Sequence, residues 1–233
     1  MHYEEILRLP VTKNDILHAL AKAKKQHFID NLRHRHPNVY FDSVLRGYIG
    51  EIALKNWFDN NGIIIEEQNH MNKEGGMDID FSFNGMELEL KTSLIPDKDR
   101  TLRNVFLNRD IKLIKRQPTI EQLKSDVHIQ IVFQQQTKKK DNWLKKQNIN
   151  IQSGDLEYLY DAFLAKGFLN RTFLFGWIDK TTLIHRIHQL PKDKQTWSFA
   201  KRTFWVCPLR NAFPPKDIIN FLKKSHPKTG ATP

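Results

Sequence analysis

The chain has 233 residues, a formal net charge of +11 and a single cysteine, Cys207. This length allows one large hydrophobic core, and one cysteine cannot form an internal disulfide. No apolar run is long enough to span a bilayer, and the N-terminus lacks the basic and apolar regions of a signal peptide. We therefore expect one cytoplasmic α/β domain without a membrane partner, with Cys207 in its core.

The charge is unevenly distributed along the chain. Residues 66–90 contain seven acidic residues and one lysine, whereas the rest of the chain is strongly basic. An acidic pocket in a basic protein suits an enzyme that holds a cation and acts on a polyanion. Basic charge also serves solubility, so charge alone leaves both interpretations open.

The first predicted helix covers residues 16–32, with Asn14 or Asp15 as its N-cap. Pro37 is expected to end it. Its far end carries a basic cluster that could contact phosphates or form a solvated helix face. The cluster consists of Lys22, Lys24, Lys25, His27, Arg33, His34, Arg35 and His36.

A second helix is predicted over residues 44–60. It contains Gly47 and Gly50, each of which weakens a helix interior by about 1 kcal/mol relative to alanine. Their presence predicts close packing of the helix against a sheet or a substrate. Glu51 follows on the same helix and could face a site or form an ordinary ion pair with Lys55.

Residues 63–65 are predicted to form a strand, and residues 77–93 a β-hairpin. In the hairpin, apolar and polar side chains alternate on both sides of Asn84-Gly85, which favours a tight turn. The polar face collects Asp78, Asp80, Glu87, Glu89 and Lys91. Four carboxylates on one face repel one another, so a divalent cation is the simplest compensating partner.

Two basic stretches follow the hairpin, and each could lie along phosphates or be a surface loop. The second stretch contains Trp143, which could stack on a base or anchor a loop. The expected nucleic-acid contacts are Lys98, Arg100, Arg103, Lys138, Lys139 and Lys140. Further strands are predicted at residues 127–133, 172–178 and 204–209, and further helices at residues 119–125, 154–166 and 216–224.

The pattern resembles the PD-(D/E)XK nuclease superfamily, in particular its small prokaryotic, phage-associated and restriction nucleases. The helix with Gly-Glu-Ile-Ala around Glu51 and the sequence Glu89-Leu90-Lys91 carry the resemblance. Met77 stands where the family has a proline, so either Asp78 or Asp80 fills the aspartate position. The distance to the Asn84-Gly85 turn favours Asp80.

The resemblance implies a restriction-endonuclease-like fold, with a central mixed β-sheet flanked by helices and extra helical elements at both ends. Residues 1–43 would be a helical extension, residues 44–224 the nuclease core with basic insertions, and residues 225–233 a tail. It also implies that Glu51, Asp80 (or Asp78) and Glu89 bind Mg²⁺, for which Mn²⁺ can substitute. Lys91 would orient the attacking water or stabilise charge on phosphorus.

The implied activity is Mg²⁺-dependent endonucleolytic hydrolysis of phosphodiester bonds in double-stranded DNA, as in a type II restriction nuclease or another defence nuclease. A homodimer would be compatible with cutting both strands. Two alternatives stay open. The chain could be a non-catalytic nucleic-acid-binding module that keeps the fold, or a nuclease acting on RNA or on particular DNA structures.

Overall fold

The computed structural model describes residues 1–25, 35–68, 79–164, 171–199 and 202–225. The strands are β1 Leu7–Leu9, β2 Glu66–Glu67, β3 Phe81–Phe83, β4 Met86–Ile95, β5 Leu113–Ile114, β6 Val127–Gln136, β7 Thr172–Asp179, β8 Thr196–Phe199 and β9 Arg202–Trp205. The helices are α1 Lys13–Lys25, α2 Pro37–Asn60, α3 Leu102–Asn108, α4 Thr137–Leu144, α5 Leu156–Leu164, α6 Lys180–His188 and α7 Asp217–Lys224.

Six strands form a mixed central sheet in the order β1-β7-β6-β4-β3-β2. Strands β4 and β6 are parallel, and the other neighbours are antiparallel. A small antiparallel sheet, β5-β9-β8, lies in a separate layer. The chain therefore has the α/β architecture with a mixed, helix-flanked sheet that the sequence predicts. None of the described helices combines the length and the hydrophobicity needed to cross a membrane.

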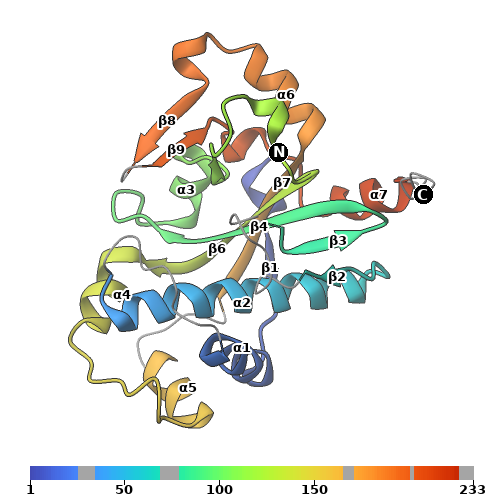
Figure 1. The fold of residues 1–233 in the computed structure, drawn as a ribbon. Helices are drawn as coiled ribbons and strands as arrows, with labels where there is room; N and C mark the ends of the chain where they lie inside the picture. Colours follow the sequence, from blue (N-terminus) through green and yellow to red (C-terminus); the bar gives the residue numbers. More distant parts are fainter. Residues whose placement is uncertain (26–34, 69–78, 165–170, 200–201, 226–233) are drawn as a thin grey trace.

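Hydrophobic side chains cover both faces of the central sheet. On one face, Leu88, Leu90 and Ile129 pack into the core that includes α1, α2 and α5. On the other face, Val132 and Phe175 pack into a second core with α3, α6 and β9. Figure 1 shows this arrangement, with α2 lying along the sheet and α1 below α2, on the side away from the sheet. Cys207 belongs to the second core, as expected.

The start of α1 differs from the prediction. The helix begins at Lys13, and Thr12 is its N-cap, because Thr12 Oγ1 accepts a hydrogen bond from the Asp15 N–H at 3.2 Å. Asp15 Oδ2 accepts in return from the Thr12 N–H at 2.8 Å. Asp15 therefore completes a capping box instead of occupying the cap position itself.

Helix α2 begins at Pro37, and not at residue 44. His36 is its N-cap, with Nδ1 accepting from the Asn38 N–H at 3.3 Å, and Pro37 occupies the first helical turn. Proline is well suited to that position because its missing N–H would have no helical partner there. The described residues before α2 also contribute a strand to the central sheet, because Leu7–Leu9 pairs with β7.

The hairpin prediction is confirmed for the described residues, while the predicted strand before it is not. Asn84 and Gly85 have φ angles of 49° and 75°, the left-handed values of a two-residue hairpin turn. Residues 63–65 lie outside any strand, and the short strand Glu66–Glu67 follows them. Met77 and Asp78 lie outside the described residues.

The two glycines of α2 have different surroundings, which gives a matched pair of substitutions. A Cβ atom at Gly50 would lie 2.6 Å from Cγ2 of Thr92, whereas a Cβ atom at Gly47 would meet nothing within 4 Å. We expect Gly50→Ala to lower the free energy of unfolding by about 1–2 kcal/mol, because overpacking outweighs the gain in helix propensity. Gly47→Ala should raise it by about 0.5–1 kcal/mol. Urea titrations of both variants test this, and equal effects would contradict the packing of Gly50 on β4.

Candidate active site

Asp80 lies immediately before β3, at the point where the hairpin strands part. Its backbone N–H donates to Leu88 O at 3.0 Å. Its side-chain Oδ2 accepts a hydrogen bond from the backbone N–H of Leu90 at 2.5 Å. Leu90 separates Glu89 from Lys91 in the chain, so this hydrogen bond fixes the Asp80 carboxylate next to the two residues of the E-x-K sequence.

Glu89 is buried, with 5 % of its surface exposed, and both of its carboxylate oxygens have partners. Lys91 Nζ lies 2.7 Å from Oε1, and His128 Nδ1 lies 2.7 Å from Oε2. Burial alone would raise the pKa of Glu89, but the hydrogen bond to His128 and the charge of Lys91 outweigh it and lower the pKa to about 2. Glu89 therefore stays ionised in spite of its burial.

His128 was not among the predicted site residues. It lies directly opposite Glu89 in the parallel pair of β4 and β6. The neighbouring Gln130 donates to Lys91 O at 2.9 Å and to Ser93 Oγ at 3.2 Å, which ties the two strands together. The alternation of Val127, Ile129 and Ile131 with these two polar residues is the sequence signal that would have placed them together on one face of their strand.

Glu51 lies on α2 and supplies a second buried carboxylate. Its side chain is 12 % exposed, and Lys22 Nζ lies 3.8 Å from its Oε2. Burial first, and then the negative charges of Asp80 and Glu67, raise the pKa of Glu51 to about 8, although Lys22 opposes the shift. The ordinary pair with Lys55 is not formed, since Lys55 Nζ binds Asp59 at 2.7 Å.

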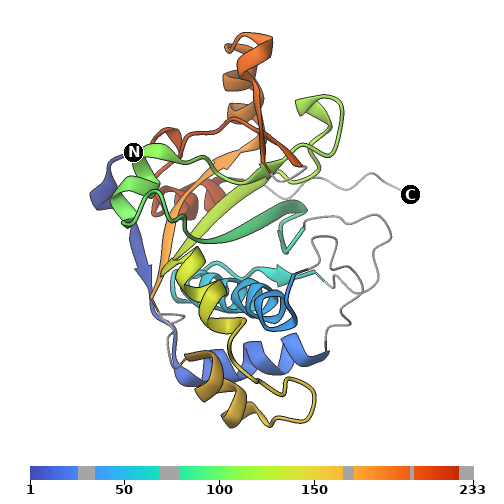
Figure 2. The ribbon, with the colours of Figure 1, turned by 90° about the vertical axis from the view of Figure 1, so that its left-hand side faces the viewer.

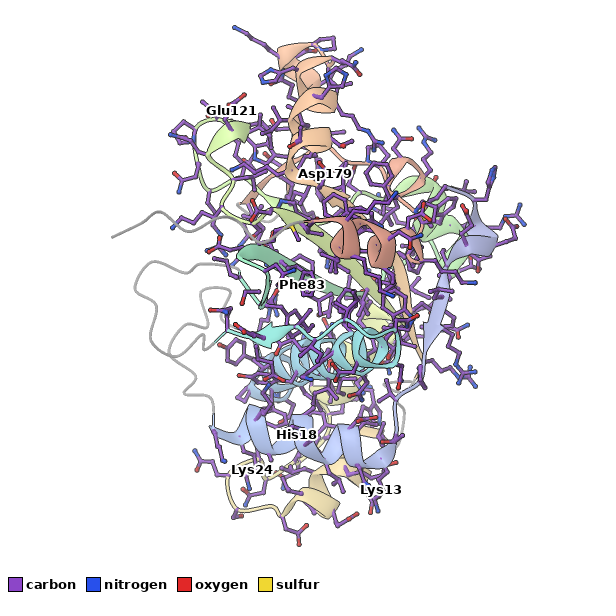
Figure 3. The ribbon with its side chains drawn as sticks, turned by 90° about the vertical axis from the view of Figure 1, so that its right-hand side faces the viewer. Lys13, His18, Lys24, Phe83, Glu121 and Asp179 are labelled. Carbon is purple, nitrogen blue, oxygen red and sulfur yellow. The ribbon has the colours of Figure 1, made fainter. Side chains whose placement is uncertain are left out.

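Asp80 links the two parts of the predicted catalytic set: its charge contributes to the raised pKa of Glu51, and its carboxylate accepts from the backbone N–H of Leu90, between Glu89 and Lys91. The hairpin lies between α1 on one side and the end of β7 on the other. Figure 3 shows Phe83 of the hairpin between His18 and Lys24 of α1 and Asp179 of β7. Among the described residues, no three His, Cys, Asp or Glu side chains gather as a ready-made metal site. Asp78, the alternative ligand, lies outside them.

The Glu51 pKa gives an expected pH dependence of stability in metal-free buffer. Because the folded-state pKa lies above the unfolded value, the folded protein binds an extra proton between about pH 4.5 and 8, and stability falls as the pH rises through this window. Glu51→Gln should therefore raise the free energy of unfolding at pH 9 by about 2–4 kcal/mol and change it little at pH 4. Urea titrations in EDTA at several pH values check this. Glu4→Gln, at an exposed position, is the control, and the same pH profile for Glu51→Gln and wild type would contradict the burial of the Glu51 carboxyl group.

Five of the six predicted nucleic-acid contacts are exposed, namely Lys98, Arg100, Arg103, Lys138 and Lys139. Lys140 requires correction, because only 1 % of its surface is exposed. Its Nζ donates to Phe163 O at 2.8 Å and lies 3.5 Å from Asp42 Oδ1. Lys140 is therefore part of a buried ion pair and does not reach a bound polyanion.

The basic cluster after α1 is only partly described, because His27, Arg33 and His34 lie outside the described residues. Lys22 binds Glu67 at 2.7 Å, and Lys24 donates to Gly154 O at 2.6 Å. His36 caps α2. These three side chains therefore have structural partners, which favours neither a phosphate surface nor a metal site there.

Comparisons with known proteins give no match: no protein-family model, no curated protein and no solved structure is significantly similar to the chain.

Proposed function

We propose that the chain is a Mg²⁺-dependent DNA endonuclease with a restriction-endonuclease-like fold, a PD-(D/E)XK nuclease acting in restriction or another defence role. The observation that carries the proposal is the series of links from Glu51 to Asp80, and from Asp80 through the Leu90 N–H to the strand that bears the Glu89–Lys91 ion pair. A glutamate whose pKa is raised to about 8 by burial first and then by the charge of Asp80, together with a buried glutamate held ionised by His128 and Lys91, is an unusual set for a purely structural role.

The donor set fits Mg²⁺ on chemical grounds. Mg²⁺ prefers oxygen ligands, keeps several waters, and is commonly held by one or two carboxylates together with substrate phosphates. Glu51 and Asp80 repel each other without a cation, and with Glu89 they would hold the ion; Mn²⁺ could replace it. The bound ion would supply positive charge to a phosphodiester and lower the pKa of a coordinated water.

The remaining residues would position the reaction. Lys91 Nζ can donate to a water or to a phosphate oxygen, and its contact with Glu89 holds the amine at the site. His128 would position Glu89 from the opposite side, through the 2.7 Å contact to Oε2. The exposed cations Lys98, Arg103 and Lys138 would bind backbone phosphates of double-stranded DNA.

One observation favours the alternative of a non-catalytic nucleic-acid-binding module. Both oxygens of Glu89 already have partners, so a cation that used this carboxylate would have to displace Lys91 or His128. A binding module with this site would lose affinity steeply with salt and cleave nothing.

A substrate panel separates these functions. Purified protein is incubated with supercoiled plasmid, single-stranded DNA and RNA, each in Mg²⁺ and in EDTA. The proposal predicts Mg²⁺-dependent cleavage of the plasmid with 5′-phosphate ends. Cleavage of RNA alone would replace DNA by RNA as the substrate, and retarded but intact substrates in every reaction would favour the binding module.

A further inference from the structure

A cavity of about 610 Å³ lies at the edge of the central sheet where β4 and β6 end. Because β4 and β6 are parallel, their last residues lie at the same edge, and α3 and α4 follow from it. Figure 2 shows this side of the molecule, with α3 and α4 leading away from the sheet. The volume falls within the range of about 300–1,000 Å³ that is usual for small-molecule sites.

Three cations from separate parts of the chain line this cavity. Arg100 and Arg103 come from the segment after β4, and Lys139 comes from α4. All three are exposed, and within the described residues no ion pair joins any of them to a carboxylate. The fold therefore gathers uncompensated positive charge from both predicted basic stretches at one cavity, which suits a phosphate.

Arg100 is held in an unusual backbone conformation at the cavity. Its φ angle is 61°, in the left-handed region that residues other than glycine, asparagine and aspartate rarely adopt. The turn is anchored by the buried Asp99, whose Oδ2 binds Arg109 Nε at 2.5 Å. Such conformations persist where the surroundings enforce them, and they are frequent at ligand sites.

The rest of the lining suits a nucleobase. Trp143 and Gln136 line the cavity together with the three cations. Buried Lys140 lies 5.4 Å from the centre of the Trp143 ring and is itself held by Asp42, so the indole has a fixed support. An aromatic ring offers a stacking surface to any base, and an amide can hydrogen-bond a base edge.

We infer that this cavity binds one nucleotide of the nucleic-acid strand, with its phosphate at Arg100, Arg103 and Lys139 and its base on Trp143. This inference rests on the proposed function, because it assumes that the substrate is a nucleic-acid strand. Ile95, which lines the cavity, is four residues beyond Lys91 on β4, a separation of about 13 Å at roughly 3.3 Å per residue. A strand that crosses the catalytic site can therefore reach the cavity within a few nucleotides.

The test measures binding in EDTA, where the proposed cleavage does not proceed. The probes are a 12-nucleotide single-stranded DNA, dAMP and inorganic phosphate. Arg100→Asn removes the cation, and asparagine tolerates the left-handed φ angle, so this variant should fold. Lys139→Ala removes a second, exposed cation of the cavity. Lys145→Ala is its matched control, because Lys145 is exposed and lies outside the cavity lining. Trp143→Leu removes the stacking surface, and thermal melting of each variant verifies its fold.

We expect Arg100→Asn and Lys139→Ala each to weaken binding of the oligonucleotide about tenfold, and Lys145→Ala less than twofold. Trp143→Leu should weaken binding of the oligonucleotide and of dAMP by a similar factor but leave binding of inorganic phosphate unchanged. Equal effects of Lys139→Ala and Lys145→Ala would overturn the inference, because they would indicate a diffuse basic surface. Binding of dAMP without any effect of the cavity variants on the oligonucleotide would also overturn it, because the occupant would then be a free nucleotide.

The two proposals fail separately. If the cavity variants weaken binding as expected but the wild-type protein cleaves nothing, the nucleotide site stands and the nuclease does not. If the protein cleaves DNA but all three cavity variants bind the oligonucleotide as wild type does, the nuclease stands and the nucleotide site does not.

Discussion

Lys91→Ala should lower the rate of Mg²⁺-dependent DNA cleavage by about 10²–10³-fold, the usual cost of removing one donor to the charge that develops in a transition state. Lys91 Nζ lies 2.7 Å from Glu89 Oε1, so the amine is held at the site before substrate binds. The substitution leaves Glu89 with its contact to His128. The fold should therefore persist, and the measurement is the initial cleavage rate at saturating Mg²⁺.

Lys98→Ala is the matched control for this experiment, because Lys98 is an exposed lysine that follows β4, the strand that bears Lys91. Loss of one phosphate contact should change its cleavage rate far less than Lys91→Ala does, and added salt should reduce the difference in DNA affinity from wild type, because the variant releases fewer counterions on binding. Circular dichroism and melting temperatures establish that both variants are folded. A folded Lys91→Ala protein that cleaves as fast as Lys98→Ala would show that the amine has no part in the reaction.

Lys140→Ala should lower the free energy of unfolding by about 3–5 kcal/mol, the cost expected when one partner of a buried ion pair is removed. The side chain is buried, binds Phe163 O and lies 3.5 Å from the fully buried Asp42. Burial lowers the pKa of Lys140, and Asp42 opposes that shift. Without Lys140, the remaining ion-pair partner of Asp42 in the described part of the chain is Arg46, whose Nε lies 2.9 Å away.

The neighbouring residue provides the control for Lys140. Lys139 is exposed, so Lys139→Ala should change the free energy of unfolding by no more than about 0.5 kcal/mol. Lys140→Met, which keeps most of the side-chain volume, should cost less than Lys140→Ala because it adds no cavity. Urea titrations measure all three variants. A cost for Lys140→Ala as small as that for Lys139→Ala would mean that Lys140 is not buried in solution.

The hairpin and the central strands could be predicted from the sequence because their signals are local. Asn84-Gly85 specifies a turn with two left-handed residues, and alternation of polar and apolar side chains fixes which face each strand buries. The same alternation placed Glu89 and Lys91 together on one face, and the ion pair between them agrees with it. Register across the turn and periodicity within a strand need no tertiary information.

The predictions differ from the structure where tertiary contacts determine the role of a residue. Pro37 can end a helix or begin one, and the sequence alone favoured the wrong choice. Lys140 belongs to a run of three lysines, and only the packing of α4 on α2 shows that its ammonium group meets Asp42. His128 lies 39 residues from Glu89 in the chain. Its role depends on the parallel pairing of β4 and β6, which no local pattern specifies.

The metal-dependent site is tested by the cleavage of supercoiled plasmid by wild type and by folded Lys91→Ala, side by side in Mg²⁺ and in EDTA. We expect nicked or linear plasmid for wild type in Mg²⁺, and intact plasmid for wild type in EDTA and for Lys91→Ala in both. Equal cleavage by the two proteins in Mg²⁺, or cleavage by wild type that persists in EDTA, would contradict a metal-dependent site formed by Glu51, Asp80, Glu89 and Lys91.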